Sequence, residues 1–457
     1  MPLTDAPRIV TARIGVAESW RLETYLANGG YEGLRKALTM TPEKLVEDVT
    51  AASLLGRGGA GFEAGRKWSM LRKAEPVYLV VNGDESEPAT FKDHMLLEND
   101  PHQIVEGALI TAYAVRAARA FVYVRGEFAL GLERMTAAVN EAYERGFIGP
   151  NILGSGWSLD LVVHPGAGAY ICGDETGLLE SLEGKRGFPR IKPPYFPAVY
   201  GLYDAPTVVN NVETMSNIPW IVLNGGAAFA GLGEGRSAGT RIFSVAGHVK
   251  RPGNYEVEMG KTTFRDLFYD PACGGGIRGG NELKAFIPGG ASSYWLGPDQ
   301  LDLALDQDKV GQAGTMLGSG SVVAMDETTC MVRAAWRITR FFAHESCGQC
   351  TPCREGSGWL EKVLRRIETG AGRDDDLDLL LDVGDTIAPG PFPHASNKAT
   401  GLEAVPFPYK MTTICFVGPS AVVPMHSALT RFRDEFEEHI RLGACPHRVA
   451  VGSEVHA

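Results

Sequence analysis

The chain has 457 residues, of which 44% are hydrophobic and 22% are charged, and it carries a formal net charge of -11. This length predicts two to four domains, and the acidic charge argues against a nucleic-acid-binding surface. No apolar run reaches the roughly 18–20 residues needed to span a bilayer. Because Met1 to Thr11 also lacks the apolar core of a signal peptide, we expect a cytosolic protein that can still dock onto a membrane-bound partner.

The first half of the sequence alternates short apolar runs, typical of buried strands, with segments whose apolar residues recur at helical spacing. In chain order we expect a strand at 77–81, a helix at 102–118, a strand at 121–124, a helix at 132–143, a strand at 159–163 and a helix at 170–182. Strands that alternate with helices predict a largely parallel sheet with both faces covered.

The pattern changes from about Arg241. Short strands at 242–245 and 285–287, with a Gly-Pro turn region at 251–253, predict a small β-rich unit. From Thr328 onward the sequence is mainly helical, as in a helical bundle. The expected helices are 331–342, 359–367, 377–383 and 428–440, interrupted by an irregular loop rich in Pro and Gly at 387–407.

The strongest chemical signal is a run of three cysteines, Cys347, Cys350 and Cys353. Zinc usually takes cysteine pairs, or cysteine with histidine, in two separated knuckles. Three close cysteines plus one distant cysteine instead match the ligation of iron–sulfur clusters. The fourth ligand must therefore come from elsewhere in the chain. The best candidate is Cys415, and the competing choices are Cys330 and Cys445.

A glycine-rich loop at 56–62 contains the pattern Gly-x-Gly-x-x-Gly. The dinucleotide-binding fingerprint requires a strand directly before it, but the preceding segment reads as a helix, so the standard Rossmann interpretation fails here. What remains is a loop whose backbone N–H groups can approach a phosphate or a flat ring. Arg57, Arg66 and Lys67 add positive charge beside it. The alternative is a flexible loop with solvated charges.

A second glycine-rich segment, 165–176, lies between a predicted strand and a predicted helix. In that position the N-terminal amides of the helix can hold a phosphate. Since a carboxylate would repel the phosphate, we expect Asp174 and Glu175 to accept hydrogen bonds from sugar or ribityl hydroxyls. The alternative is an acidic helix N-terminus that the helix dipole alone favours.

Three further segments offer polar partners for a nucleotide. Residues 82–88 crowd four polar groups at the end of the first predicted strand, where ligands bind in open α/β sheets. The cations of 185–192 suit an anionic dinucleotide. The side-chain amides of Asn210 and Asn211 can form hydrogen bonds with a flavin ring or its phosphate. Simple acidic turns or solvated loops are the alternatives.

The order of these motifs resembles the flavoprotein F subunits of bacterial NADH–quinone oxidoreductase, respiratory complex I. The matching segments are 56–67, 82–88, 166–192, 210–214 and 345–356, and the resemblance runs from about residue 50 to about 440. It implies an α/β fold with a Rossmann-like domain for FMN and NADH, a ubiquitin-like β-grasp domain of the soluble-ligand-binding type, and a helical bundle with a [4Fe–4S] cluster. The expected bounds are 1–240, 241–327 and 328–445, followed by a tail at 446–457.

The resemblance also implies roles for individual residues. It places FMN against Gly56, Arg57, Gly58, Lys67, Asn82, Asp84, Tyr170, Gly173, Asp174, Glu175, Asn210, Asn211 and Thr214. It places NADH on Phe62, Glu87 and Lys192, and the cluster on Cys347, Cys350, Cys353 and Cys415. The chain departs from the family pattern at Asp174, which is usually Glu, and at Met70, where an aromatic residue often holds the adenine. An extra residue in 194–197 leaves open which ring meets the nucleotide.

The implied activity is hydride transfer from NADH to FMN, followed by single-electron transfer to the cluster and onward to partner subunits and quinone. No side chain need act as a general base. The expected partners are the thioredoxin-like [2Fe–2S] subunit and the large multi-cluster subunit, at the cytoplasmic side of the membrane without direct insertion. One alternative is the diaphorase subunit of a soluble NAD-linked hydrogenase or formate dehydrogenase. A second is a non-catalytic nucleotide-binding module with a structural zinc.

Overall fold

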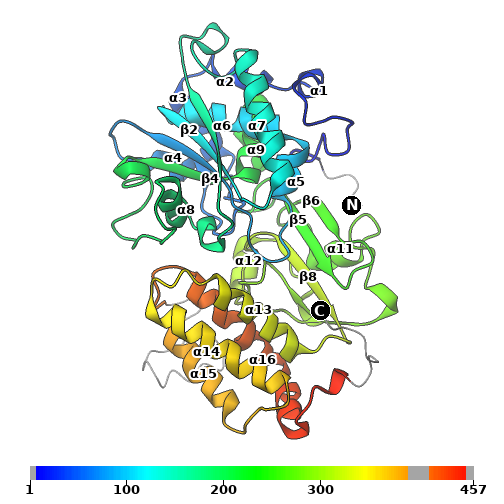
Figure 1. The fold of residues 1–457 in the computed structure, drawn as a ribbon. Coiled ribbons are helices and arrows are strands. Elements are labelled where there is room, and N and C mark those ends of the chain that lie inside the picture. The colour runs from blue at the N-terminus through cyan, green and yellow to red at the C-terminus, as the bar shows by residue number, and fades with distance from the viewer. Residues whose placement is uncertain (1–6, 390–410, 449–457) are drawn as a thin grey trace.

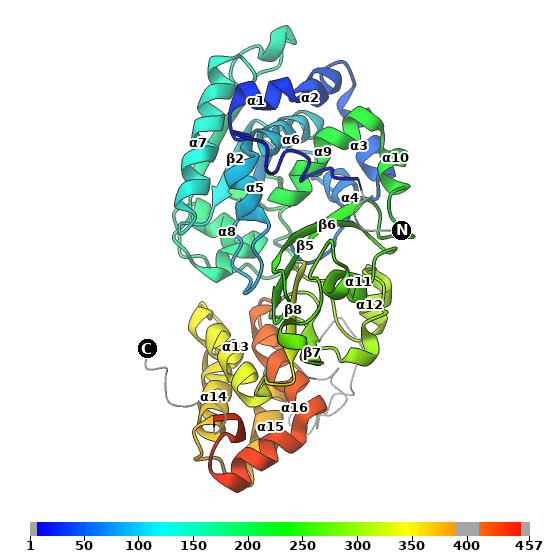
Figure 2. The same cartoon turned by 90° about the vertical axis from the view of Figure 1, so that its right-hand side faces the viewer.

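The computed structural model describes residues 7–389 and 411–448, and it divides into three parts that follow one another along the chain. An α/β part lies at the top of Figure 1, a second sheet lies below and beside it, and four helices form the lower end. Figure 2 shows the same three tiers from the side. The expected fold class, Rossmann-like sheet, β-grasp-like unit and helical bundle, is confirmed.

The first sheet is entirely parallel, in the order β3-β2-β1-β4. Its strands are β1 (Tyr78–Gly83), β2 (Arg119–Val124), β3 (Asp160–Pro165) and β4 (Thr207–Asn211). The register sets Asn82 of β1 opposite Asn211 of β4. Because both strands run in the same direction, these two amides meet at the carboxyl edge of the sheet, where open α/β sheets bind ligands.

Ten helices accompany this sheet in the described part of the chain. They are α1 (Leu22–Ala27), α2 (Glu32–Ala37), α3 (Pro42–Ala51), α4 (Ala64–Ser69), α5 (Asp93–Asn99), α6 (Pro101–Ala114), α7 (Ala129–Glu144), α8 (Glu175–Leu182), α9 (Val212–Asn224) and α10 (Gly226–Ala230). Nearly every residue of α6 is buried, since it packs between the sheet and α9. A buried carboxylate, Glu106 of α6, accepts the backbone N–H groups of Tyr31 and Leu34 at 2.9 Å and so holds α2 in place.

The predicted helix at 170–182 is wrong in its first turn. A short 3-10 helix, η3 (Tyr170–Gly173), is followed by an extended residue, Asp174, before α8 begins. The Asp174 carboxylate accepts the backbone N–H groups of Thr176 and Gly177, at 2.9 and 3.1 Å. Asp174 therefore caps α8, and capping residues have non-helical dihedrals.

The second sheet has the order β6-β5-β8-β7. Its strands are β5 (Thr240–Gly247), β6 (Gly253–Glu258), β7 (Leu283–Ile287) and β8 (Ser321–Asp326), with α11 (Phe264–Tyr269) and α12 (Gln307–Gln312) in the connections. The central pair β5 and β8 is parallel, while β6 and β7 pair antiparallel at the edges. The expected strands correspond to β5 and β7. Strands β4, β6 and β8 are not among those predicted from the sequence.

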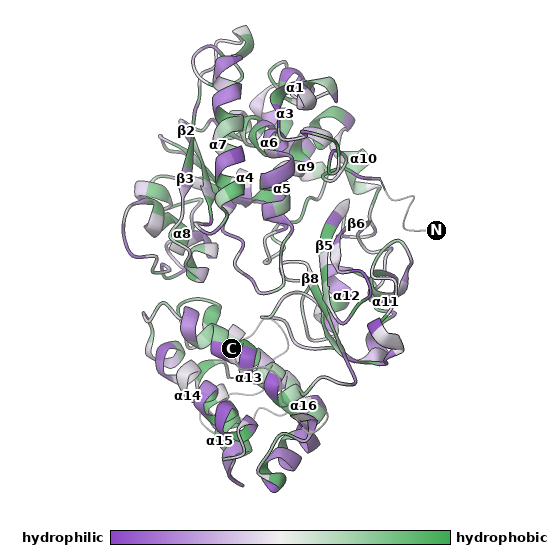
Figure 3. Cartoon of the chain, turned by 45° about the vertical axis from the view of Figure 1, so that its right-hand side comes forward, coloured by the Kyte–Doolittle hydropathy of each residue, from purple (hydrophilic) through white to green (hydrophobic). Residues whose placement is uncertain are grey.

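The lower part is a bundle of α13 (Met331–Glu345), α14 (Thr351–Glu368), α15 (Asp376–Ile387) and α16 (Val417–Leu442). All four expected helices are confirmed, and each is longer than expected. Figure 3 shows hydrophilic and hydrophobic residues alternating along α13 and α14, as in helices with one buried face. Pro424 lies inside α16, which is why the pattern indicated a later start. The expected loop at 387–407 falls mostly outside the described residues.

Short 3-10 helices complete the structure: η2 (Ile152–Gly154), η4 (Leu202–Asp204), η5 (Arg278–Gly280), η6 (Pro298–Gln300) and η7 (Pro446–Arg448). Across residues 7–389 and 411–448, no helix combines the length and apolar character required to cross a bilayer. The three parts meet through specific contacts. Tyr170 N–H donates to Glu345 of α13 at 3.1 Å, and the Ser292 N–H donates to Glu87 at 2.7 Å.

Candidate functional site

A cavity of about 510 Å³ lies where the three parts meet. It adjoins a second cavity of about 500 Å³, and the two share Gly58, Gly59, Ala60, Asn82, Gly173, Asp174 and Asn211 in their walls. The shared residues come from the first glycine-rich loop, the carboxyl ends of β1 and β4, and the segment before α8. Together the two cavities form one cleft with the dimensions of a nucleotide site.

The glycine-rich loop of residues 56–62 forms one wall of this cleft. The Gly56 N–H donates to the carbonyl of Phe62 at 2.9 Å, which closes the loop. Gly59 and Gly61 have φ values of +142° and +63°, which side-chain-bearing residues rarely adopt. Backbone groups can therefore approach a ligand here without a side chain between them.

Arg57, which we expected to add positive charge beside the loop, has its side chain buried in the interior instead. Its guanidinium is buried and donates through Nη2 to the carbonyls of Ala238 and Thr240, at 3.0 and 2.8 Å. Burial lowers its pKa to about 10. Its Nε is one of the buried nitrogens without a hydrogen-bond partner in the described part of the chain. The side chain thus joins the glycine-rich loop to β5 while its backbone lines the cleft.

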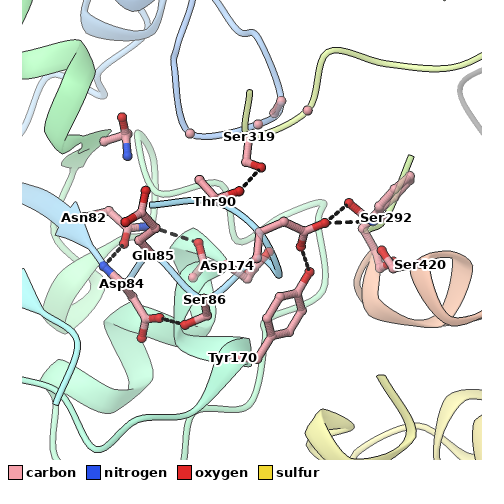
Figure 4. Close-up of a pocket in the computed structure, with 18 of the residues that line it drawn as sticks. Asn82, Asp84, Glu85, Ser86, Thr90, Tyr170, Asp174, Ser292, Ser319 and Ser420 are labelled. Atoms are coloured by element: carbon pink, nitrogen blue, oxygen red, sulfur yellow. Dashed lines mark hydrogen bonds between the residues drawn. The ribbon is translucent and has the colours of Figure 1, made fainter. Parts of the chain in front are cut away.

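Figure 4 shows polar groups at the end of β1 and in the segment after it, among them Asn82, Asp84 and Ser86. Asn82 donates through Nδ2 to the Gly173 carbonyl at 2.9 Å, and its Oδ1 accepts the Asp84 N–H at 3.0 Å. The Ser86 hydroxyl donates to Asp84 Oδ1, while Oδ2 of Asp84 is buried without a partner among the described residues. Burial raises the pKa of Asp84 to about 7. A ligand hydroxyl or ring N–H would satisfy this oxygen.

The raised pKa of Asp84 predicts a pH effect on stability. Its ordinary value is 3.8, so the folded protein holds the proton more tightly than the unfolded chain does. Without a bound ligand, the stability of the protein should therefore fall as pH rises from about 4 to about 7. Asp84→Asn should remove this loss. At pH 8 the variant should have a free energy of unfolding up to about 4 kcal/mol higher than the wild type, measured by urea denaturation, and at pH 4 the two should be equal. Asp160→Asn, at an exposed site on β3, should follow the wild type throughout.

Glu87 is held by Tyr170 and Ser292, two residues from different parts of the fold that Figure 4 labels. Its Oε2 accepts the Tyr170 hydroxyl at 2.6 Å, and its Oε1 accepts the N–H and hydroxyl of Ser292 at 2.7 and 2.6 Å. Burial raises the pKa of Glu87, although these hydrogen bonds lower it. Ser292 is not among the residues predicted from the sequence. The sequence feature that could have pointed to it is the Gly289–Gly290 pair after β7, which is typical of a tight loop that approaches a ligand.

Cations and carboxylates alternate along the wall of the second cavity. Lys67 Nζ lies 2.9 Å from the Val209 carbonyl and 3.4 Å from Glu175 Oε2. Lys192 Nζ lies 3.1 Å from Glu175 Oε1 and 3.7 Å from Asp174 Oδ2. Burial raises the pKa of Glu175, but the two lysines outweigh it and hold the pKa below its usual value. The structure thus brings together residues that are far apart in sequence, as the motifs predict.

The end of β4 supplies the opposite wall. Asn211 donates to Asp93 Oδ2 at 2.6 Å and caps α9 by accepting the Glu213 N–H at 3.0 Å. Asn210, with its amide turned to satisfy both atoms, accepts the indole N–H of Trp68 at 2.9 Å. The Thr214 hydroxyl accepts the Arg57 N–H at 2.9 Å. Phe62 is 41% exposed. Phe62, Met70 and Phe196 line the second cavity, whereas Tyr195 is not among its lining residues.

A buried charge network behind Asn211 was not predicted from the sequence. Lys92 Nζ lies 2.7 Å from Asp93 and 2.9 Å from Glu213, with all three side chains almost fully buried. Lys92 and Asp93 also line the first cavity. Their positions depend on α5 and α9 packing side by side, which local sequence patterns do not reveal.

The four predicted cluster cysteines gather at the interface between the bundle and the α/β part. Cys353 and Cys415 belong to one apolar cluster of buried residues, and Cys347 and Cys350 pack against it. Cys350 occupies the N-cap position of α14 without a capping hydrogen bond from its side chain, and Cys353 lies in the first turn of this helix. Cys415 also lines the first cavity. Burial raises the pKa of the Cys353 thiol to about 11, so iron must displace its proton on binding.

The residues present fit both a flavin nucleotide and an iron–sulfur cluster. The cleft offers a glycine-lined wall, a buried carboxylate oxygen with no partner in the described residues, and lysines suited to phosphates. The thiols of Cys347, Cys350, Cys353 and Cys415 match the four-cysteine donor set of a [4Fe–4S] cluster. Within the described residues these sulfurs do not form a single-ion site, as expected if several irons lie between them.

Comparisons with known proteins agree with this geometry. Residues 49–220 match the Nuo51 FMN-binding domain, residues 242–294 the SLBB domain, and residues 333–439 the iron–sulfur binding region of NADH-ubiquinone oxidoreductase-F. The chain is 49% identical over 438 residues to the NADH-quinone oxidoreductase F subunit of Mycobacterium tuberculosis, covering 94% of this chain and 92% of that protein. The F subunit of Salmonella typhimurium is 43% identical over 424 residues, covering 92% and 90%.

A solved structure of an NAD+-reducing [NiFe]-hydrogenase in the air-oxidized state is also similar. It has 31% sequence identity and a TM-score of 0.76, and the match covers 95% of this chain and 67% of the hydrogenase chain. Fold, cleft and cysteine site together define a flavin- and iron–sulfur-binding oxidoreductase. The chain belongs to the family of NADH-quinone oxidoreductase F subunits. FMN and a [4Fe–4S] cluster are its cofactors.

Proposed function

We propose that this chain is the electron-input subunit of an NADH-quinone oxidoreductase, where it oxidises NADH and delivers the electrons to its own cluster. The observation that carries the proposal is that Cys415, a candidate cluster ligand, lines the same cavity as Asn82 and Asp84. FMN supplies the conversion from two-electron to one-electron transfer that this function needs. The chain's own residues position the two cofactors.

Each of the proposed binding residues lines one or both of the two cavities. The flavin contacts are Gly56, Arg57, Gly58, Lys67, Asn82, Asp84, Tyr170, Gly173, Asp174, Glu175, Asn210, Asn211 and Thr214. For NADH, Phe62 offers a ring, Lys192 a charge for the phosphates, and Glu87 a carboxylate for the nicotinamide side. Phe196 lines the second cavity, so it, rather than Tyr195, is the aromatic residue we assign to the adenine.

Membership of this family implies further subunits, and we propose two of them. They are the thioredoxin-like [2Fe–2S] subunit and the large multi-cluster subunit, because electrons that leave the [4Fe–4S] cluster need acceptors within the complex. We also propose that the chain sits peripherally on the cytoplasmic side of the membrane. The proposed domain bounds are 1–240, 241–327 and 328–445, with a tail from 446 to 457.

Anaerobic absorption spectra of the purified chain test the function. Before NADH is added, we expect both flavin and iron–sulfur absorption. Adding NADH should bleach the flavin band and reduce the cluster within one experiment, whereas NADPH at the same concentration serves as the comparison nucleotide. Colourless protein after anaerobic preparation, or flavin that NADH leaves oxidised, would overturn the proposal.

The second candidate is the diaphorase subunit of an NAD-linked hydrogenase, which the similarity to the hydrogenase structure favours. The F subunits match at higher identity, and the Mycobacterium tuberculosis relative matches over 92% of its own length, against 67% for the hydrogenase chain. Copurification distinguishes the two. Quinone reductase activity in membrane fractions supports the first function, and a soluble hydrogenase supports the second.

A further inference from the structure

Four metal-binding side chains meet at the end of the bundle that faces away from the cleft. Cys330, Glu368, His439 and Cys445 are all buried, and one ligand atom from each lies within 4.8 Å of the other three. None of them belongs to the flavin or iron–sulfur site described above. They come from the N-cap of α13, the end of α14, the end of α16 and the segment after α16.

Four of the six distances between these atoms are close to the edges of a tetrahedron around one ion, and all six are within 4.8 Å. Cys330 Sγ lies 3.7 Å from Cys445 Sγ, 3.4 Å from His439 Nε2 and 3.6 Å from Glu368 Oε2. His439 Nε2 lies 3.6 Å from the same Glu368 oxygen. Zinc bonds of about 2.3 Å to sulfur and about 2.0–2.2 Å to nitrogen and oxygen give tetrahedral edges of about 3.3–3.8 Å.

Neighbouring groups fix the direction of two of the ligands. His439 Nδ1 lies 2.6 Å from the Glu435 carbonyl, so this nitrogen takes the ring proton and Nε2 faces the other three residues. Glu368 Oε1 accepts the Arg333 Nε–H at 2.8 Å, which turns Oε2 toward the cysteines. Outer hydrogen bonds of this kind are typical of metal ligands, because they set the tautomer and the ring orientation.

We propose that Cys330, Glu368, His439 and Cys445 bind one zinc ion in a closed, structural site. Two thiolates, one imidazole and one carboxylate at tetrahedral spacing suit zinc, whereas magnesium and calcium prefer oxygen ligands alone. With two thiolates and the carboxylate ionised, the filled site carries one net negative charge, and the Arg333 guanidinium lies beside it. All four ligands come from the protein, so no position is open for substrate.

The position of the site indicates a clamp for the bundle rather than a step in electron transfer. Cys330 precedes α13, and the cluster cysteine Cys347 follows it, so the helix separates the two sites by roughly 22 Å. In Figure 2 the red end of the described chain turns back toward α14. Zinc would join this segment to the ends of α13, α14 and α16, and so hold the helices that carry the iron–sulfur ligands.

Metal analysis of the full-length holoprotein, purified anaerobically, tests the site. We expect about one zinc per chain in addition to about four irons, and X-ray absorption at the zinc edge should show two sulfur and two nitrogen or oxygen neighbours. Cys445→Ser and His439→Gln should lose the zinc and lower the melting temperature. Cys273→Ser, at a buried cysteine of the β-grasp-like unit, should keep it. Cys415→Ala should also keep zinc while losing iron.

Three results would overturn the proposal. They are holoprotein with full iron content and no zinc, zinc surrounded by four sulfurs, and a Cys330–Cys445 disulfide found by peptide mass spectrometry. Where Cys445→Ser fails to fold, wild-type protein stripped by a chelator and refilled with cobalt(II) provides the test. Thiolate-to-cobalt charge-transfer absorption supports the site, and its absence from a stripped protein that retains its cluster refutes it.

Discussion

Replacing Cys415 with alanine should remove the [4Fe–4S] cluster while leaving the flavin site able to react with NADH. Cys415 is buried and lines the flavin cavity, and it shares one apolar cluster with the other three cysteines. Because alanine has no ligand atom, we expect iron to fall from about four per chain toward zero. With the cluster gone, electron transfer from NADH to acceptors beyond it should fall by more than the roughly 10–100-fold that changes outside the ligand shell cause.

Iron content, the reduced-cluster signal in electron paramagnetic resonance and the rate of flavin bleaching measure these effects separately. Cys273→Ser provides the matched control, since Cys273 is also buried but lies in the β-grasp-like unit. A normal cluster in Cys415→Ala would show that the ligand assignment is wrong. The alternatives from the sequence, Cys330 and Cys445, lie with Glu368 and His439 at the other end of α13.

Glu87→Gln should weaken the use of NADH without releasing FMN. The Glu87 carboxylate accepts hydrogen bonds from Tyr170 and Ser292, and an amide has only one oxygen with which to accept them. Hydrogen bonds to a charged group contribute about 1.5–3 kcal/mol each. Under the proposed function the carboxylate also faces NADH, and loss of one hydrogen bond to it should lower kcat/KM for NADH by about 10–100-fold.

Steady-state kinetics with ferricyanide as acceptor measure this effect, because that acceptor does not depend on the partner subunits. Glu127→Gln is the control, since Glu127 is a half-exposed carboxylate paired with Arg125. The FMN content of both variants should equal that of the wild type. An unchanged kcat/KM in Glu87→Gln would remove Glu87 from the NADH site.

Much of the fold follows from local patterns. The apolar runs and helical spacings located β1, β2, β3, β5, β7 and the four bundle helices, because each buries a regular face. The pattern failed at Asp174, where capping replaces the helix, and at β4, whose polar end residues obscure the strand. It also failed at Pro424, which signals a helix end but is buried inside α16.

The identities of the cofactors follow from the amino-acid sequence alone. Three cysteines at two-residue spacing indicate an iron–sulfur cluster through their donor atoms, whereas FMN follows from the resemblance of the linked motifs to the family of F subunits. The arrangement of the sites relative to one another depends on the folded molecule. Cys415 meets the flavin cavity, Ser292 meets Glu87, and Cys330 meets His439 because helices and sheets pack segments far apart in the chain against one another. Distances of that kind are set by packing between elements, which no local pattern records.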